Sequence, residues 1–313
     1  MIRRAGRHVL GARHKRGFVI LIYHRVLDEP DPLRPGEVTV TEFAGQMAAL
    51  AQCFNVLPLA EAIERQAAGT LPPMAAAITF DDGYRDNLER ALPVLQQHNL
   101  PATVFITTGT LGRCMWNDVA IELLRQAPPQ GFDSGELGLG TLPAANITER
   151  RASLFRVLAH LKSLPRTQRD DSLQALLQTH DVEPPVGLML DAAGVRELHR
   201  AGIDTGAHTV HHPILTRIPL SEAEAEIAGS RTALEDITGS TITLFAYPNG
   251  RPGMDYTGEH ADLVRRLGFR AAVSTERGAN RPGHDRFELR RFTPWDRTPL
   301  RFVGRLLLSA LRD

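Results

Sequence analysis

Two adjacent carboxylates follow an apolar segment in the motif Ile78-Thr-Phe-Asp-Asp-Gly-Tyr84. If that segment is a strand, a turn starting at Gly83 lets Asp81 and Asp82 face the same cavity. Two carboxylates held so close resist ionisation, and a bound cation would relieve their repulsion and keep both charged. The motif therefore indicates a cation site. The alternative is a surface turn stabilised by Asx-type hydrogen bonds.

Histidines at metal-ligand spacing occur in a second motif, His208-Thr-Val-His-His-Pro213, which also follows a predicted strand. His208 and His212 lie four residues apart and can offer imidazole nitrogens to a metal such as zinc. We expect His211 to be a neighbour of this site rather than a ligand. A lone histidine is more often a core or surface residue, so the prediction depends on the pair. Two imidazoles and one carboxylate leave open positions on an ion, as catalytic zinc requires.

A turn that exposes backbone donors is the third candidate, in the segment Phe245-Ala-Tyr-Pro-Asn-Gly250. Pro248 fixes the turn, and Gly250 permits an unusual backbone angle. The N–H groups of such a turn can stabilise a developing oxyanion. Pro-Asn-Gly is also a common turn that carries no chemistry, and the residues alone leave both interpretations open.

Short apolar segments alternate with helical segments along most of the chain, which indicates a parallel sheet with crossover helices. The predicted strands are Phe18–Tyr23, Ala76–Phe80, Ala102–Thr107, Ile203–Ala207, Thr243–Ala246, Ala271–Val273 and Leu289–Phe292. The predicted helices are Thr41–Gln52, Leu59–Ala67, Arg85–His98, Asp191–Ala201, Ser221–Ile237 and Thr257–Leu267. About seven such units favour an α/β fold with a closed or nearly closed (β/α) barrel over an open sheet.

Local signals support one helix start and two helix ends. Ser221-Glu-Ala-Glu224 matches a capping box, in which the hydroxyl and the later carboxylate bond first-turn amides. Gly239 and Gly268 each follow a predicted helix, where glycine is a common stop signal.

Residues 111–190 interrupt the alternation of strands and helices. They contain a loop-like segment, Gly131–Gly140, and two helical patterns, Glu149–Leu164 and Gln168–His180. We interpret them as a helical insertion after the third strand of a single domain that spans residues 18–313. Barrel enzymes use such insertions to shape the substrate site.

The motifs Thr79-Phe-Asp-Asp-Gly83 and His208-Thr-Val-His-His-Pro213 resemble the first two signature motifs of the polysaccharide deacetylases. These form the NodB-homology group, carbohydrate esterase family four, and the resemblance covers residues 18–295. It implies a distorted (β/α) barrel and metal-dependent removal of N-acetyl, sometimes O-acetyl, groups from sugars. It also implies that Asp81 is the catalytic base, whereas Asp82, His208 and His212 bind the metal.

The third motif of the family usually begins with arginine, but Ala246 stands at that place here. That arginine normally orients the catalytic carboxylate, and Arg290 or Arg291 is a candidate to replace it from a neighbouring strand end. The resemblance assigns the Asn249 N–H to the oxyanion. We group Tyr247, Trp295 and Arg291 with Asn249 as oxyanion or substrate residues.

The family's last motif, Leu-x-His, has no counterpart after Phe269, where His284 lies in a loop-like stretch. The first strand instead reads Leu21-Ile-Tyr-His24, which resembles the start of the circularly permuted poly-N-acetylglucosamine deacetylases. In that branch the histidine acid comes from this strand, so we predict that His24 is the general acid. The alternative is a histidine that caps the first strand. Trp295 is predicted either to line an acyl pocket or to pack in the core, and the same alternatives hold for Trp116.

Composition places the chain among ordinary globular proteins. Its 313 residues include 36 Lys plus Arg and 36 Asp plus Glu, and the zero net charge argues against a general nucleic-acid binder. A hydrophobic share of 42% is too high for a disordered chain. Cys53 and Cys114 are the only cysteines, so we expect no disulfide framework.

Both ends of the chain are basic. Residues 1–17 form a basic tail with six Arg or Lys and no acid, either solvated or in contact with anionic lipid or glycan. The nearby apolar run, Phe18–Tyr23, is too short for a signal peptide or a membrane span, so we expect a cytoplasmic protein. Residues 299–312 predict a basic amphipathic helix that either closes the fold or lies on the inner membrane surface.

We therefore expect a zinc-dependent hydrolase that removes N-acetyl groups from an amino-sugar glycan or its precursor in exopolysaccharide or cell-envelope synthesis. Nickel, cobalt or manganese would accept the same ligands. One alternative is a relative that binds glycan without catalysis. Another is an enzyme of the same fold that hydrolyses a different C–N bond, in a formyl group or a cyclic amide. The exact glycan, its linkage and the oligomeric state do not follow from the sequence.

Overall fold

The computed structural model describes the backbone of residues 17–312 and the side chains of residues 17–309. The expected basic tail therefore lies outside the described residues, apart from Gly17. The chain divides into two compact units. The barrel unit contains residues up to 29, residues 36–111 and residues from 190 onward, and the insertion unit contains residues 30–35 and 112–189.

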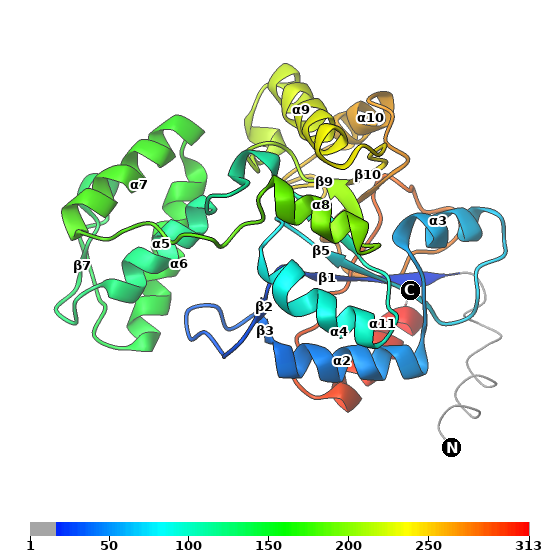
Figure 1. Cartoon of the computed structure of the whole chain (residues 1–313). Coiled ribbons are helices and arrows are strands. Elements are labelled where there is room, and N and C mark those ends of the chain that lie inside the picture. Colours follow the sequence, from blue (N-terminus) through cyan, green and yellow to red (C-terminus); the bar gives the residue numbers. More distant parts are fainter. Residues whose placement is uncertain (1–16, 313) are drawn as a thin grey trace. The chain divides into compact units, whose positions relative to one another are not determined.

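The barrel unit is built on a curved sheet of seven strands, all of whose pairings are parallel (Figure 1). The main order is β1-β5-β6-β9-β10-β11, and β4 pairs with β5. The strands are β1 Phe18–Tyr23, β4 Asn55–Val56, β5 Ala75–Phe80, β6 Thr103–Ile106, β9 Asp204–Ala207, β10 Leu244–Ala246 and β11 Ala271–Val273. The prediction of a distorted (β/α) barrel is confirmed.

Six of the seven predicted strands are present, but the prediction of a strand at Leu289–Phe292 is wrong. Leu289 makes an isolated bridge with Val273 of β11, and Phe292 makes one with Leu21 of β1. The segment thus crosses from one sheet edge to the other and runs alongside neither strand for more than one residue pair. We call residues 289–292 the closing segment. Its backbone bonds to Ala272, Ser274, Ile20 and Ile22 close the curved sheet.

The central strands form because their residues are apolar on both faces, as parallel sheets covered by helices require. All six residues of β1 and all six of β5 are buried. Their side chains alternate between two core clusters. Val19, Leu21 and Tyr23 belong to the larger cluster, which includes residues of the surrounding helices, whereas Phe18 and Ile20 belong to a smaller one.

Helices surround this sheet (Figure 1). They are α2 Val40–Cys53, α3 Leu59–Ala67, α4 Leu92–Gln97, α8 Ala192–Arg200, α9 Leu220–Thr238, α10 Gly258–Arg266 and α11 Pro299–Arg312. The short elements are a π-helical turn η1 Asn87–Ala91, the 3₁₀ turns η2 Thr108–Thr110 and η4 Leu215–Arg217, and the paired strands β2 Val26–Leu27 and β3 Val38–Thr39.

Two details of the predicted helices need correction. The capping box at Ser221–Glu224 does not exist, because α9 begins one residue earlier and has Pro219 as its N-cap, without a side-chain cap. The segment Arg85–His98 is not one α-helix, since its first part is the π-helical turn η1. The stop signals are confirmed, because Gly239 and Gly268 have φ angles of 69° and 84°, in the left-handed region.

The insertion unit has its own small core, formed by residues such as Leu124, Phe132 and Val157. Its elements are α5 Trp116–Gln126, the antiparallel strands β7 Phe132–Asp133 and β8 Thr141–Leu142, the 3₁₀ turn η3 Gly135–Leu137, α6 Ile147–Ser163 and α7 Arg166–His180. Both predicted helices are present, and α5 is an additional one. Trp116 is partly buried against this core, with the Arg169 guanidinium 4.9 Å above its ring.

The C-terminal helix α11 packs its apolar face into the barrel unit. Phe302 and Leu306 are fully buried in the larger core cluster, while Leu300 is exposed. Burial of this apolar face is expected of a helix that closes the fold. Within residues 17–312, none of the helices has the length and apolar character needed to cross a membrane.

Candidate metal centre

The residues predicted to form the functional site lie where strands of the barrel unit end. Asp81 and Asp82 follow β5, His208 follows β9, and His24 follows β1. All these strands are parallel, so their carboxyl ends meet at one end of the sheet, which is where barrel enzymes assemble their active sites. Topology therefore brings together motifs that are more than 100 residues apart in the chain.

Three side chains form a triad that could hold a metal ion, namely Asp82, His208 and His212. Asp82 Oδ1 lies 3.5 Å from Nε2 of His208 and 3.5 Å from Nε2 of His212. This oxygen is buried and has no hydrogen-bond partner among the described residues. Two ligand atoms that each lie about 2.1 Å from a tetrahedral zinc ion are about 3.4 Å apart. The spacing, the burial and the unpaired acceptor therefore fit a divalent ion.

Local backbone structure fixes the two imidazoles. The Nδ1 atom of His208 bonds the Ala246 carbonyl oxygen at 2.7 Å, so Nδ1 carries the hydrogen and Nε2 is left for a metal. The His212 N–H donates to Thr209 Oγ1 at 3.0 Å. Asp82, Thr209 and His212 have φ angles of 73°, 63° and 56°, in the left-handed region. Residues other than glycine adopt this backbone region at a cost in free energy, and such strain concentrates at functional sites.

The triad strongly perturbs the acidity of its members. Burial raises the pKa of Asp82, but the nearby His208 imidazole and the charges of His212 and His24 outweigh it and hold that pKa well below its usual range. Burial lowers the pKa of His212 to about 4, so this imidazole is neutral near pH 7. Burial also lowers the pKa of His208, but the neighbouring carboxylates Asp82 and Asp81 raise it above its ordinary value.

Asp81 is held outside the triad by a buried arginine. Its two oxygens accept from Arg291 Nη1 and Nη2, each at 2.6 Å, and Arg291 Nε donates to the Ser274 carbonyl oxygen at 2.8 Å. Burial raises the pKa of Asp81, but the charges of Arg291 and His208 outweigh it, and the net pKa lies below the usual value. Arg291 belongs to the closing segment and, of the two candidates Arg290 and Arg291, is the one that pairs with Asp81. Arg290 instead lies 3.4 Å from Glu276.

His24 lies beside both carboxylates. Its charge is among those that lower the pKa of Asp81 and of Asp82. The residue is half-buried, and its carbonyl oxygen accepts from Asn87 Nδ2 at 2.9 Å, which anchors the chain just after β1. His284, the other candidate acid, is exposed and accepts a hydrogen bond from the Arg281 N–H at 3.4 Å.

The turn after β10 leaves the backbone N–H of Asn249 available as a hydrogen-bond donor. Asn249 has a φ angle of 59°, and its N–H has no acceptor among the described residues. The carbonyl oxygens of Asn249 and Gly250 accept from the side chain and N–H of Thr275 at 2.6 and 2.8 Å. A Cβ at Gly250 would lie 2.9 Å from the Thr275 nitrogen, so only glycine fits this turn.

Tyr247 and Trp295, both predicted to contact substrate, differ in their burial. Tyr247 is fully buried, stacks on Tyr256 at 3.8 Å and donates to the Phe287 carbonyl oxygen at 2.9 Å. Its side chain is a core residue, and its grouping with the oxyanion or substrate residues stays a prediction. Trp295 is 57% exposed beneath the Arg277 guanidinium, so the alternative of core packing is wrong for it.

Sequence reasoning missed Glu226, a buried acid on α9 whose carboxylate bonds His211 and the backbone beside it. Residue type alone does not distinguish this glutamate from its exposed neighbours Glu222 and Glu224. A helical wheel anchored on Ala223 and Ile227 would have shown that only Glu226 lies on the buried side. His211 is not part of the cluster of Asp82, His208 and His212, and its Nδ1 lies 2.6 Å from Glu226 Oε1.

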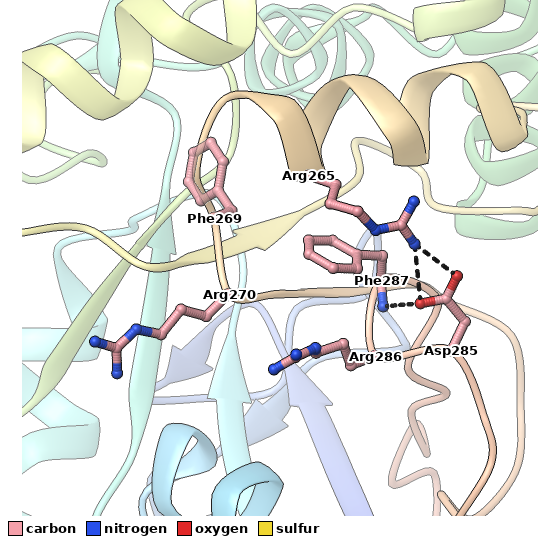
Figure 2. A pocket seen from close by; sticks show the side chains of 6 residues that line it. All are labelled: Arg265, Phe269, Arg270, Asp285, Arg286 and Phe287. Carbon is pink, nitrogen blue, oxygen red and sulfur yellow. Dashed lines mark hydrogen bonds and ion pairs between the residues drawn. The ribbon is translucent and has the colours of Figure 1, made fainter.

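A separate pocket of about 330 Å³ opens near the start of β11, away from the strand ends that carry the triad (Figure 2). Its lining residues are Arg265, Phe269, Arg270, Asp285, Arg286 and Phe287. Arg265 pairs with Asp285 and Arg270 pairs with Glu64, so surface acids already neutralise two of the three arginines.

Comparisons with known proteins bear on the family of this chain. The model of the polysaccharide deacetylase family matches residues 68–272, more than half of the chain. The Bacillus subtilis (strain 168) protein YxkH, named as a candidate polysaccharide deacetylase, is 21% identical over 202 residues, which cover 64% of this chain and 45% of YxkH. The chain thus spans about half the length of this curated relative.

Solved structures share the fold at low sequence identity. The Streptococcus pyogenes deacetylase PplD, solved in complex with acetate, has a TM-score of 0.63 at 18% identity, over 94% of this chain and 98% of PplD. IcaB from Ammonifex degensii has a TM-score of 0.61 at 20% identity, over 94% and 97%. The polysaccharide deacetylase BC0361 from Bacillus cereus has a TM-score of 0.59 at 18% identity, over 93% and 69%.

The family match includes both carboxylates and both imidazoles of the triad region, whereas His24 and Arg291 lie outside residues 68–272. The likeness to the solved structures describes the fold. Together with the motifs at Asp81 and His208, the family match confirms the resemblance found in the sequence. The chain belongs to the polysaccharide deacetylase family.

Proposed function

We propose that the protein is a metal-dependent hydrolase that removes N-acetyl groups from an amino-sugar glycan or glycan precursor used in exopolysaccharide or cell-envelope synthesis. The observation that carries the proposal is that two adjacent carboxylates have different hydrogen-bond partners. Asp82 Oδ1 is left unpaired between two imidazoles, whereas Arg291 holds both oxygens of Asp81. Asp82 is therefore arranged as a ligand and Asp81 as a base.

Each residue of the site has a separate role in amide hydrolysis. A zinc ion held by Asp82, His208 and His212 would supply Lewis acidity toward an acetyl carbonyl and a water molecule. Asp81 accepts the proton of the attacking water, and Arg291 keeps that carboxylate ionised and oriented. The Asn249 N–H donates to the oxyanion that develops on the acetyl group. His24 gives a proton to the amine nitrogen as acetate leaves, a transfer for which imidazole is well suited near neutral pH.

Removal of metal is the first test of this proposal. We expect the protein to release acetate from an N-acetylglucosamine oligomer, and a chelator such as dipicolinate to lower that rate by at least about 100-fold. Added zinc should restore it, because Asp82, His208 and His212 remain in place. Acetate is measured by a coupled enzymatic assay, with the amine counted in parallel. Acetate release that is unchanged by the chelator would contradict the proposal.

The same assay separates the rival functions. A protein that binds the oligomer but releases no acetate under any metal would be a glycan-binding relative. Release of formate from an N-formyl sugar, or opening of a cyclic amide, in preference to acetate release would indicate hydrolysis of another C–N bond. Chromatographic identification of each product distinguishes these outcomes.

The role of His24 is tested by its alanine variant. We expect His24→Ala to lower kcat on the N-acetylated sugar by about 100-fold, because the amine then departs without a proton donor. Hydrolysis of an aryl acetate should fall much less, since a phenolate needs no proton to leave. His284→Ala is the matched control and should keep its activity. A large loss for His284→Ala with none for His24→Ala would assign the acid to the other histidine.

A further inference from the structure

The turn that carries the ligand His212 is held by a carboxylate from a different element. Glu226, on α9, accepts from the N–H groups of Val210 and His211 through one oxygen, Oε2, at 2.9 and 2.7 Å. Its other oxygen, Oε1, lies 2.6 Å from His211 Nδ1. Glu226 is only 8% exposed, so these bonds form away from bulk water, where charge-assisted hydrogen bonds are strong.

The opposite side of the same turn is held by backbone. The Gly109 N–H, in η2, donates to the Val210 carbonyl oxygen at 2.7 Å. A Cβ at Gly109 would lie 2.6 Å from that oxygen and 3.0 Å from His211 Cδ2, so the two segments are in direct contact. Val210 therefore has its N–H bound to α9 and its carbonyl bound to η2.

This anchoring matters because the turn is strained at the ligand. Thr209 and His212 both have left-handed φ angles, and neither is glycine. Without external bonds, residues 209–212 would relax toward ordinary backbone angles, and the His212 ring would move with them. We propose that Glu226 is a positioning residue for the metal centre, which acts through its two backbone hydrogen bonds to place His212. The inference rests on the metal site of the proposed function.

Zinc titration of the metal-free, full-length protein by calorimetry tests this role. We expect Glu226→Ala to weaken zinc affinity by 10- to 100-fold, in the range found for residues that support metal ligands. Glu226→Gln should stay within about threefold of wild type, because its amide oxygen can still accept both backbone N–H groups. His211→Ala should also stay close to wild type, since it leaves those two bonds intact. Glu224→Ala, exposed on the same helix, is the control.

A second variant approaches the turn from its other side. Gly109→Ala should also weaken zinc binding, because its Cβ would push the Val210 carbonyl away, whereas Gly258→Ala meets nothing within 4 Å and should not. Circular dichroism of each metal-free variant checks folding, and Gly109→Ala decides the question if Glu226→Ala does not fold. Wild-type affinity in Glu226→Ala, or in a Gly109→Ala variant used in its place, overturns the inference. So does a loss in His211→Ala as large as in Glu226→Ala. Failure of the wild-type protein to bind zinc overturns the proposed metal centre itself.

Discussion

Asp81→Asn is expected to lower kcat for deacetylation by about 1000-fold while zinc still binds, because an amide cannot accept the proton of the attacking water. Asp81 lies outside the triad, and its oxygens bond Arg291. The variant leaves the buried Arg291 charge less well compensated, so it should unfold at a lower temperature. Turnover is therefore measured well below that temperature, and zinc affinity is measured by calorimetry.

The matched control is the adjacent carboxylate. Asp82→Asn should lose zinc and activity together, since Asp82 supplies the triad oxygen that has no other partner. The two variants change neighbouring residues by the same substitution, so a difference in zinc affinity isolates the two roles. Loss of zinc in Asp81→Asn, or retention of zinc with full activity in Asp82→Asn, would show that the roles are assigned wrongly.

Arg291→Met should cost about 3–5 kcal/mol of unfolding free energy at pH 7, because it leaves the Asp81 carboxylate buried without its partner. In the wild-type protein the pKa of Asp81 is lowered. The ionised pair thus stabilises the fold above the unfolded pKa of about 3.9, and this stability is lost as pH falls through the lower folded pKa. In the variant burial raises that pKa, so stability falls as pH rises above about 3.9.

The stability difference between wild type and Arg291→Met should therefore widen from pH 4 to pH 7. Denaturant titrations of the metal-free proteins at several pH values measure it. Arg290→Met is the control, and its partly exposed pair with Glu276 should contribute less than about 1 kcal/mol. A difference that does not change with pH would mean that Arg291 contributes by packing rather than by compensating the Asp81 charge.

Much of the site could be predicted because it depends on strand ends. The apolar runs at 18–23 and 75–80 must form buried parallel strands, and parallel strands bring their following residues to one end of the sheet. The motifs at Asp81, His208 and His24 were therefore expected to meet. Their residue types and spacing were enough to predict a candidate metal site with two imidazoles and one carboxylate, and the family resemblance assigned the carboxylate to Asp82.

The remaining site residues depend on features that local pattern does not encode. Arg290 and Arg291 are neighbours, and which of them reaches Asp81 depends on the path of the closing segment between two sheet edges. Tyr247 follows a strand as the predicted site residues do, yet its ring turns into the core beside Tyr256. Glu226 lies in a run of alternating Glu and Ala, and its role appears only when α9 is packed against the turn at 209–212.

The position of Arg291 after all three triad residues in the sequence has a consequence for maturation of the protein during translation. The ribosome completes Asp81, Asp82, His208 and His212 well before it reaches residue 291. A nascent chain can thus hold every side chain of the triad while the Asp81 carboxylate still lacks its counter-ion. We expect hydrolytic competence to arise only after the closing segment is synthesised, when it seals the barrel and delivers the guanidinium.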